Sequence, residues 1–162
     1  YPVALAFDGT GHRLGLAWRD TRSGDAEIFF RLLGEDGAIA GPLTDGLAVG
    51  DGLSLALIAG FYYYGGIALQ YDALENGWVI VWDMVPSVAT GSPNGAEIFI
   101  TEIASDGSSF DSPYRLSDAG GRSIMPALAI GGVYATVWHD NRDDLVDNTF
   151  EGDIYAASLS CP

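Results

Sequence analysis

The chain has 162 residues, of which 22 are acidic and 7 are basic, and its formal net charge is −15. This charge argues against a nucleic-acid binder and against adsorption to anionic lipid, because phosphate groups would repel the chain. With 48% hydrophobic and 12% aromatic residues, the chain is not a disordered acidic tail, and its length suits one domain with a sizeable core. The single cysteine, Cys161, has no partner within the chain, so we expect it to pair with another chain or with a further segment.

Glycine is abundant and lysine is absent, so all 7 basic residues are arginines. Glycine, aromatic and β-branched residues in this proportion are typical of short strands joined by tight turns. The first residues, Tyr1-Pro2-Val3, lack the basic and apolar regions of a signal peptide. We interpret the sequence as a mature or excised secreted chain and predict an extracellular or periplasmic location.

Three stretches of the chain repeat one pattern: an apolar run, a second run that ends near a tryptophan, and an acidic-Ile-aromatic triplet. The anchor tryptophans Trp18, Trp82 and Trp138 lie 64 and 56 residues apart. The triplets that follow them are Glu27-Ile28-Phe29, Glu97-Ile98-Phe99 and Asp153-Ile154-Tyr155. We predict that the three tryptophans are core residues between adjacent repeats.

Each repeat reads as antiparallel strands with hairpin signals at Asp36-Gly37 and Asp106-Gly107. A fourth short run follows at Gly41–Thr44 and Tyr114–Ser117, whereas the third repeat stops after its third run. We therefore predict an all-β fold, a propeller-like repeat of four-stranded antiparallel blades with about three blades in this chain. The single domain 1–162 would divide into blade 1 at about 1–46, an insertion at about 47–64, blade 2 at about 65–118 and an incomplete blade 3 at about 119–162.

The run from Gly52 to Tyr71 carries no charge and has nearly the length of a membrane-spanning helix. Four glycines and three consecutive tyrosines divide it into pieces of strand length. We favour buried strands joined by a turn and predict no membrane insertion. Its segment Leu53–Tyr64 is a candidate contact with another copy of the chain.

The first repeat carries a recognisable motif: Asp8-Gly9, Leu14, Trp18, Asp20, Arg22, Gly24, Glu27-Ile28-Phe29, Asp36-Gly37 and Leu43-Thr44. This motif resembles the TolB-type (PD40-like) β-propeller repeat, in a secreted bacterial variant. The other repeats keep Trp82 and Asp83, and Trp138, Asp140 and Arg142. The resemblance implies a propeller used as a binding scaffold and implies nothing specific about activity.

The charged residues of the motif have a structural interpretation. Asp20 with Arg22, and Asp140 with Arg142, follow the end of a predicted strand, where they can satisfy backbone groups of the turn. We also expect each arginine to pair with the acid at the start of the next strand, Glu27 for Arg22 and Asp153 for Arg142.

An acidic loop near the C-terminus is the candidate metal site. The loop Asp140–Glu151 contains five acids among twelve residues, and clustered hard oxygen ligands suit Ca²⁺. The predicted ligands are Asp140, Asp143, Asp144, Asp147 and Glu151. The loop is not an EF-hand, because Arg142 and Leu145 occupy positions that require Asp or Asn and glycine. A solvated acidic loop without metal is the alternative.

Motifs of catalysis are scarce in this sequence. The chain has no Gly-x-Ser-x-Gly elbow and no Ser-x-Asp-x-Gly-x-Thr-Trp box of the kind found in sialidase propellers. His139 lies beside Asp140, but a surface or turn histidine is the simpler interpretation. We therefore assign no catalytic residue.

These observations lead to one main hypothesis and one alternative. The main hypothesis is a non-catalytic binding or assembly module that completes its propeller by association and binds a protein partner or another copy through loops Pro86–Gly95 and Asn141–Glu151. The alternative is a secreted hydrolase of glycosidase or peptidase type that uses acidic loop residues. A buried carboxylate pair in a central pocket would favour the hydrolase, and an exposed apolar edge would favour assembly.

Overall fold

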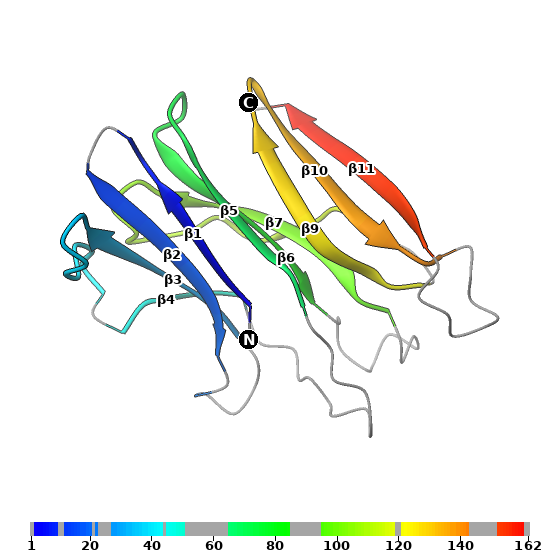
Figure 1. Cartoon of the computed structure of the whole chain (residues 1–162), viewed down its shortest axis with the longest axis horizontal. Helices are drawn as coiled ribbons and strands as arrows, with labels where there is room; N and C mark the ends of the chain where they lie inside the picture. Colours follow the sequence, from blue (N-terminus) through cyan, green and yellow to red (C-terminus); the bar gives the residue numbers. More distant parts are fainter. Residues whose placement is uncertain are drawn as a thin grey trace.

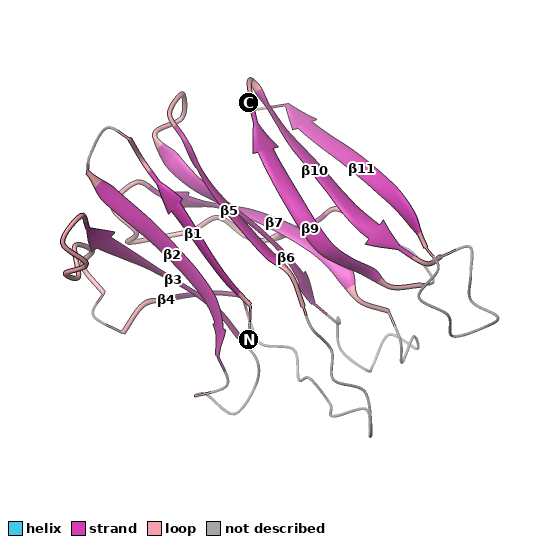
Figure 2. Cartoon of the chain, viewed as in Figure 1, coloured by secondary structure: helices cyan, strands magenta, loops and turns pink. Residues whose placement is uncertain are grey.

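The computed structural model describes residues 2–9, 12–20, 22, 27–43, 45–50, 65–84, 95–118, 121–142 and 152–160. In this part of the chain all regular secondary structure is β-strand (Figure 2), which confirms the predicted all-β class. The described residues include no helix with the length and apolar character to cross a bilayer. The segment Leu53–Tyr64 and Cys161 lie outside the described residues.

The first sheet is an antiparallel meander in the order β1-β2-β3-β4. Its strands are β1 (Val3–Phe7), β2 (Arg13–Asp20), β3 (Glu27–Gly34) and β4 (Leu47–Gly50). Burial along β2 alternates from residue to residue, as expected for a strand in which successive side chains point to opposite faces.

The fourth strand begins later than predicted. We expected it at Gly41–Thr44, but the strand that pairs with β3 is Leu47–Gly50, inside the span predicted as an insertion. Pro42 has no N–H to donate to a ladder. Gly46, at φ +88°, then turns the chain and donates from its N–H to the carbonyl of Leu43 at 3.3 Å. Strand pairing resumes only after this turn, so the first repeat extends to about residue 50.

Two further sheets follow with the same antiparallel connectivity (Figure 1). The second sheet contains β5 (Ile67–Asp72), β6 (Gly77–Met84), β7 (Glu97–Ala104) and β8 (Tyr114–Arg115). The third sheet contains β9 (Ser123–Ile130), β10 (Val133–Asp140) and β11 (Asp153–Ser160). Strand β8 falls within the predicted fourth run of the second repeat.

The two Asp-Gly pairs form tight turns, as their sequence predicts. Gly37 and Gly107 have φ values of +78° and +70°, which a glycine adopts without steric cost. The side chains of Asp36 and Asp106 each accept a hydrogen bond at 2.9 Å from the backbone N–H two residues later. These Asx turns satisfy backbone groups where the third strands of the first two sheets, β3 and β7, end.

The three sheets lie side by side, with β1, β5 and β9 next to one another (Figure 1). Buried side chains form two cores between neighbouring sheets. The core between the first and second sheets includes Ala17, Phe30, Leu32, Trp78, Ile80 and Trp82. The core between the second and third sheets includes Val79, Val81, Ile98, Leu128, Tyr134 and Trp138.

Each sheet has two chemically different faces. The tryptophan face carries the anchor tryptophan and its cross-strand neighbours, which are Val3 and Phe29 beside Trp18, Ile67 and Phe99 beside Trp82, and Tyr155 beside Trp138. The alanine face carries Ala4 and Ala17 in the first sheet, Ala68 in the second, and Ala127, Ala129 and Ala135 in the third. In both cores the tryptophan face of one sheet packs on the alanine face of the preceding sheet.

Gly15 of β2 lies directly against Trp78 of the second sheet. A Cβ atom at this position would lie 2.6 and 2.7 Å from two carbons of the Trp78 ring and 3.1 Å from the Phe30 ring. Trp78 is fully buried, so the ring has no free space to move into. Glycine is therefore required here by packing.

Gly15→Ala is expected to lower the free energy of unfolding by about 1–3 kcal/mol, because it overpacks this interface. Gly131→Ala is the matched control, since no heavy atom lies within 4 Å of a Cβ at that position. The control is expected to change stability by less than about 0.5 kcal/mol. Urea unfolding followed by tryptophan fluorescence measures both values, and equal effects of the two variants would contradict the packing.

Candidate functional site

The second strand of each sheet carries an aspartate at its last or next-to-last residue, and the three aspartates have two different roles. Asp20 and Asp140 follow their tryptophans by two residues and accept a hydrogen bond from the indole Nε1, at 3.2 and 3.1 Å. Asp83 follows Trp82 by only one residue, so it belongs to the opposite face of its strand. Accordingly, Trp82 Nε1 is buried without a hydrogen-bond partner among the described residues.

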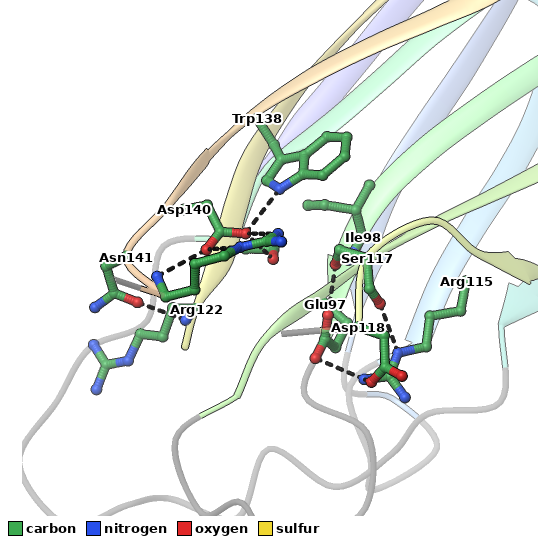
Figure 3. Close-up of polar contacts among 11 residues, drawn as sticks. Glu97, Ile98, Arg115, Ser117, Asp118, Arg122, Trp138, Asp140 and Asn141 are labelled. Atoms are coloured by element: carbon green, nitrogen blue, oxygen red, sulfur yellow. Dashed lines mark hydrogen bonds and ion pairs between the residues drawn. The ribbon is translucent and has the colours of Figure 1, made fainter. Parts of the chain in front are cut away.

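Asp140 is the centre of a buried network at the end of β10 (Figure 3). Its Oδ2 accepts hydrogen bonds from Ser123 Oγ at 2.7 Å and from Arg142 Nη2 at 2.6 Å. Its Oδ1 accepts from the backbone N–H and from Nε of Arg142, at 2.9 and 3.0 Å. Burial raises the pKa of Asp140, but the hydrogen bonds from Arg142, Ser123 and Trp138 outweigh it and lower the pKa from 3.8 to about 2.

Asp20 repeats this arrangement at the end of β2 in a more exposed setting. Arg22 donates to it from its backbone N–H at 2.9 Å, from Nε at 2.7 Å and from Nη2. The hydrogen bonds from the Arg22 side chain are the main reason why the pKa of Asp20 falls to about 2. The ion pair of each motif arginine is thus with the aspartate two residues before it, whereas we expected the acid that opens the next strand.

Asp83 connects all three sheets. Its Oδ1 accepts a hydrogen bond from Arg19 Nη2 of the first sheet at 3.2 Å, and the same nitrogen donates to the Asp83 carbonyl at 2.6 Å. Its Oδ2 accepts from the backbone N–H of Gly66, just before β5, at 2.7 Å and from that of Met125, in β9 of the third sheet, at 2.8 Å. Both charged side chains are almost completely buried.

A second buried carboxylate, Glu97, lies near the Asp140 network (Figure 3). Glu97 Oε2 accepts from Ser117 Oγ at 2.5 Å, and Oε1 accepts from Arg115 Nη2 at 2.6 Å. Ser117 Oγ in turn accepts from the backbone N–H of Ile98 at 2.9 Å. This network holds the segment after β8 against β7. The repeated acidic-Ile-aromatic triplet contains this carboxylate, but the sequence pattern alone did not indicate the network.

The structure describes one of the five predicted calcium ligands, Asp140. Both of its oxygens accept hydrogen bonds within the motif, so an Asp140–calcium bond would have to replace some of them. No group of three or more His, Cys, Asp or Glu side chains within the described ranges is arranged to hold a metal ion. The other four predicted ligands lie outside those ranges, and the calcium site stays a prediction.

An open cavity of about 190 Å³ lies between the second and third sheets. The wall contains residues from the end of β5, the β5–β6 turn, β6, β7 and the segment after β7, together with Tyr134 of β10. Four carboxylates line it: Asp72, Glu75, Glu102 and Asp111. The sequence analysis did not single out these four residues.

The environment of Glu102 is electrostatically unusual. Burial raises the pKa of Glu102, a hydrogen bond with Tyr134 lowers it, and the charges of Asp111, Asp72 and Glu75 raise it again, with a net increase. The charges of the other three carboxylates therefore repel that of the partly buried Glu102.

Comparison with protein-family models finds no match, and neither does comparison with curated proteins. Among solved structures, the chain is similar to an N-acetylgalactosamine deacetylase from F. plautii, solved in complex with blood group B trisaccharide. The TM-score is 0.56 at 13% sequence identity, and the match covers 97% of this chain and 48% of the deacetylase chain. The chain thus spans about half the length of that protein, and the likeness concerns the fold alone.

Asp83→Asn is expected to lower the free energy of unfolding by about 3–5 kcal/mol, because it removes the buried carboxylate charge that pairs with the Arg19 guanidinium. Asp20→Asn is the matched control, and loss of its more exposed, solvent-screened pair is expected to lower stability much less. Urea unfolding of the two variants and the unmodified chain gives the comparison. Equal losses would contradict the linking role of Asp83.

Asp140→Asn is expected to change the pH dependence of stability. The pKa of Asp140 is lower in the folded chain than its ordinary value of 3.8. Its ionised form therefore stabilises the fold above about pH 4, and this contribution disappears as the pH falls toward 2. The stability difference between the unmodified chain and the variant should be about 1–2 kcal/mol at pH 7 and should shrink below pH 4. A difference that stays constant from pH 7 to pH 2.5 would contradict the assignment.

Proposed function

We propose that the chain is a non-catalytic, extracellular or periplasmic binding and assembly module built of propeller-like blades. In this proposal its two outer sheet faces bind a second copy of the chain. The observation that carries the proposal is the contact between tryptophan face and alanine face, which occurs twice inside the chain. One half of the same contact is exposed at each end of the row of sheets.

The tryptophan face of the first sheet is the first exposed half. Val3, Leu5 and Phe7 of β1 lie on this face and are 63%, 59% and 51% exposed. In the second sheet, the equivalent strand places Ile67 beside Trp82 against the first sheet. An apolar strip of this kind on a sheet face marks an interaction surface.

The alanine face of the third sheet is the second exposed half. Val137 is 42% exposed and lies between Ala127 and Ala156 of the neighbouring strands. In the first sheet, the equivalent small side chains, Ala4 and Ala17, receive the aromatic side chains of the second sheet. The two exposed faces are therefore complementary in the same way as the two faces that meet inside the chain.

The net charge affects how this contact can form. Each copy carries −15, so two copies repel each other at low ionic strength. Salt screens this repulsion and leaves the apolar contact intact, so association should strengthen as salt is added.

The hydrolase alternative keeps one observation in its favour. Asp72 is buried and Glu102 is half-buried in the same cavity, and a carboxyl group with a raised pKa is a common general acid. The cavity lies between two sheets, and its acids are not those of the loops Pro86–Gly95 and Asn141–Glu151. We therefore retain assembly as the proposed function.

The proposal predicts that Leu5→Glu and Val137→Glu each weaken self-association at least about tenfold, because each places a charge in one half of the contact. Leu74→Glu is the matched control, since Leu74 is 75% exposed in the β5–β6 turn and lies on neither face. Sedimentation equilibrium measures association at several salt concentrations.

A mixture of the first two variants provides the sharpest test. Leu5→Glu keeps an intact alanine face and Val137→Glu keeps an intact tryptophan face, so equimolar mixing should restore a 1:1 complex. No complex in the mixture, or a monomeric unmodified chain at all concentrations and salt levels, would overturn the proposal.

A further inference from the structure

The cavity between the second and third sheets contrasts with the other buried carboxylates of the chain. Those other buried carboxylates are paired with arginines, as Asp8–Arg13, Asp83–Arg19, Glu97–Arg115 and Asp140–Arg142. The chain contains no lysine and only 7 arginines. Within the described residues, none of the four cavity carboxylates forms an ion pair, so this site has no countercharge from the part of the chain around it.

One oxygen of Asp72 also has no hydrogen-bond donor among the described residues. The residue is 1% exposed and lines the cavity. Its Oδ1 accepts from the backbone N–H groups of Leu74 and Glu75, at 2.8 and 3.3 Å. Its Oδ2 is buried with no hydrogen-bond partner among the described residues. A buried carboxylate oxygen without a donor is costly, and a donor from a ligand would remove that cost.

The shape and lining of the cavity restrict the kind of ligand. A volume of about 190 Å³ far exceeds the roughly 10–15 Å³ that one water needs. The described carboxylates are not grouped to hold a metal ion. Trp78, Phe110 and Tyr134 add aromatic surface to the wall, and aromatic rings attract organic cations.

We propose that this cavity binds a small organic cation that carries several N–H donors, a guanidinium or a primary ammonium group. Its donors pair with the carboxylates of Asp72 and Glu102, and its charge relieves the repulsion within the group. A guanidinium fits the carboxylates well, because its planar fork of N–H groups forms paired hydrogen bonds with them. Asp111 and Glu75 at the wall add attraction without direct contact.

The test uses methylguanidinium as the probe and methylurea, its neutral analogue of similar shape, as the control. Each compound is titrated into the ¹⁵N-labelled chain and into the Leu5→Glu variant, so that binding is measured independently of self-association. We expect methylguanidinium to shift the amide signals of residues 72–79 and 102–104 with a Kd on the order of 1 mM. The affinity should fall as sodium chloride is added.

Two variants locate the site. Asp72→Asn and Glu102→Gln are each expected to weaken methylguanidinium binding at least tenfold, and Glu35→Gln, an exposed acid in the turn after β3, is expected to leave it unchanged. Glu102→Gln serves as the decisive variant if Asp72→Asn does not fold. Equal affinity for methylurea, no shift with methylguanidinium, or unchanged binding in Glu102→Gln would overturn the proposal. None of these outcomes bears on assembly, which the sheet-face variants test separately.

Discussion

The arrangement of the three sheets depends on the buried ion pair between Arg19 and Asp83. A charge in the interior is tolerated only when it is paired and fully hydrogen-bonded. Arg19 comes from the first sheet, and the remaining oxygen of Asp83 takes one backbone donor before β5 and one in β9 of the third sheet. The pair can be satisfied only when all three sheets are in place. Unfolding of one sheet would leave a buried charge in the other sheets without some of its hydrogen bonds, which costs free energy. The three sheets are therefore expected to unfold together in one cooperative transition.

The same arrangement explains how a chain with three times as many acids as bases can fold. Within the described residues, five arginines pair with carboxylates, and four of these pairs involve carboxylates that are almost completely buried. Arg31 lies over the Trp18 ring, at 5.6 Å from its centre. Basic residues are therefore concentrated where the interior needs them. The acids that remain at the surface and in the cavity carry the excess negative charge.

Local signals were predictable from the sequence, and contacts between distant segments were not. The Asp-Gly turns and the buried Trp82 and Trp138 follow from residue type and periodicity. The role of Asp83 did not, because a shift of one residue in a strand moves a side chain to the opposite face. The start of β4 at Leu47 was also missed, because Gly46 and Pro42 act on strand pairing through local geometry. In the sequence pattern, Asp83 looks equivalent to Asp20 and Asp140, and only the folded structure separates their roles.

The cavity was not predictable for a different reason. Its acids come from positions between residues 72 and 111, and Tyr134 joins them only when the third sheet packs on the second. With 22 acids in the chain, no spacing between two of them stands out. What distinguishes this group is that none of its members forms an ion pair with the described residues, and only the folded structure shows this.

The difference between the two faces of each sheet has a consequence for symmetry. A contact between unlike faces has a direction, so a second copy that binds in this way presents a fresh tryptophan face or a fresh alanine face to a third. A two-fold dimer would join like faces and cannot use this contact. Successive copies instead follow a rotation, which produces a closed ring when the angle divides a full turn and an open helical array when it does not. The angle between neighbouring sheets, rather than the strength of the contact, therefore sets the number of copies.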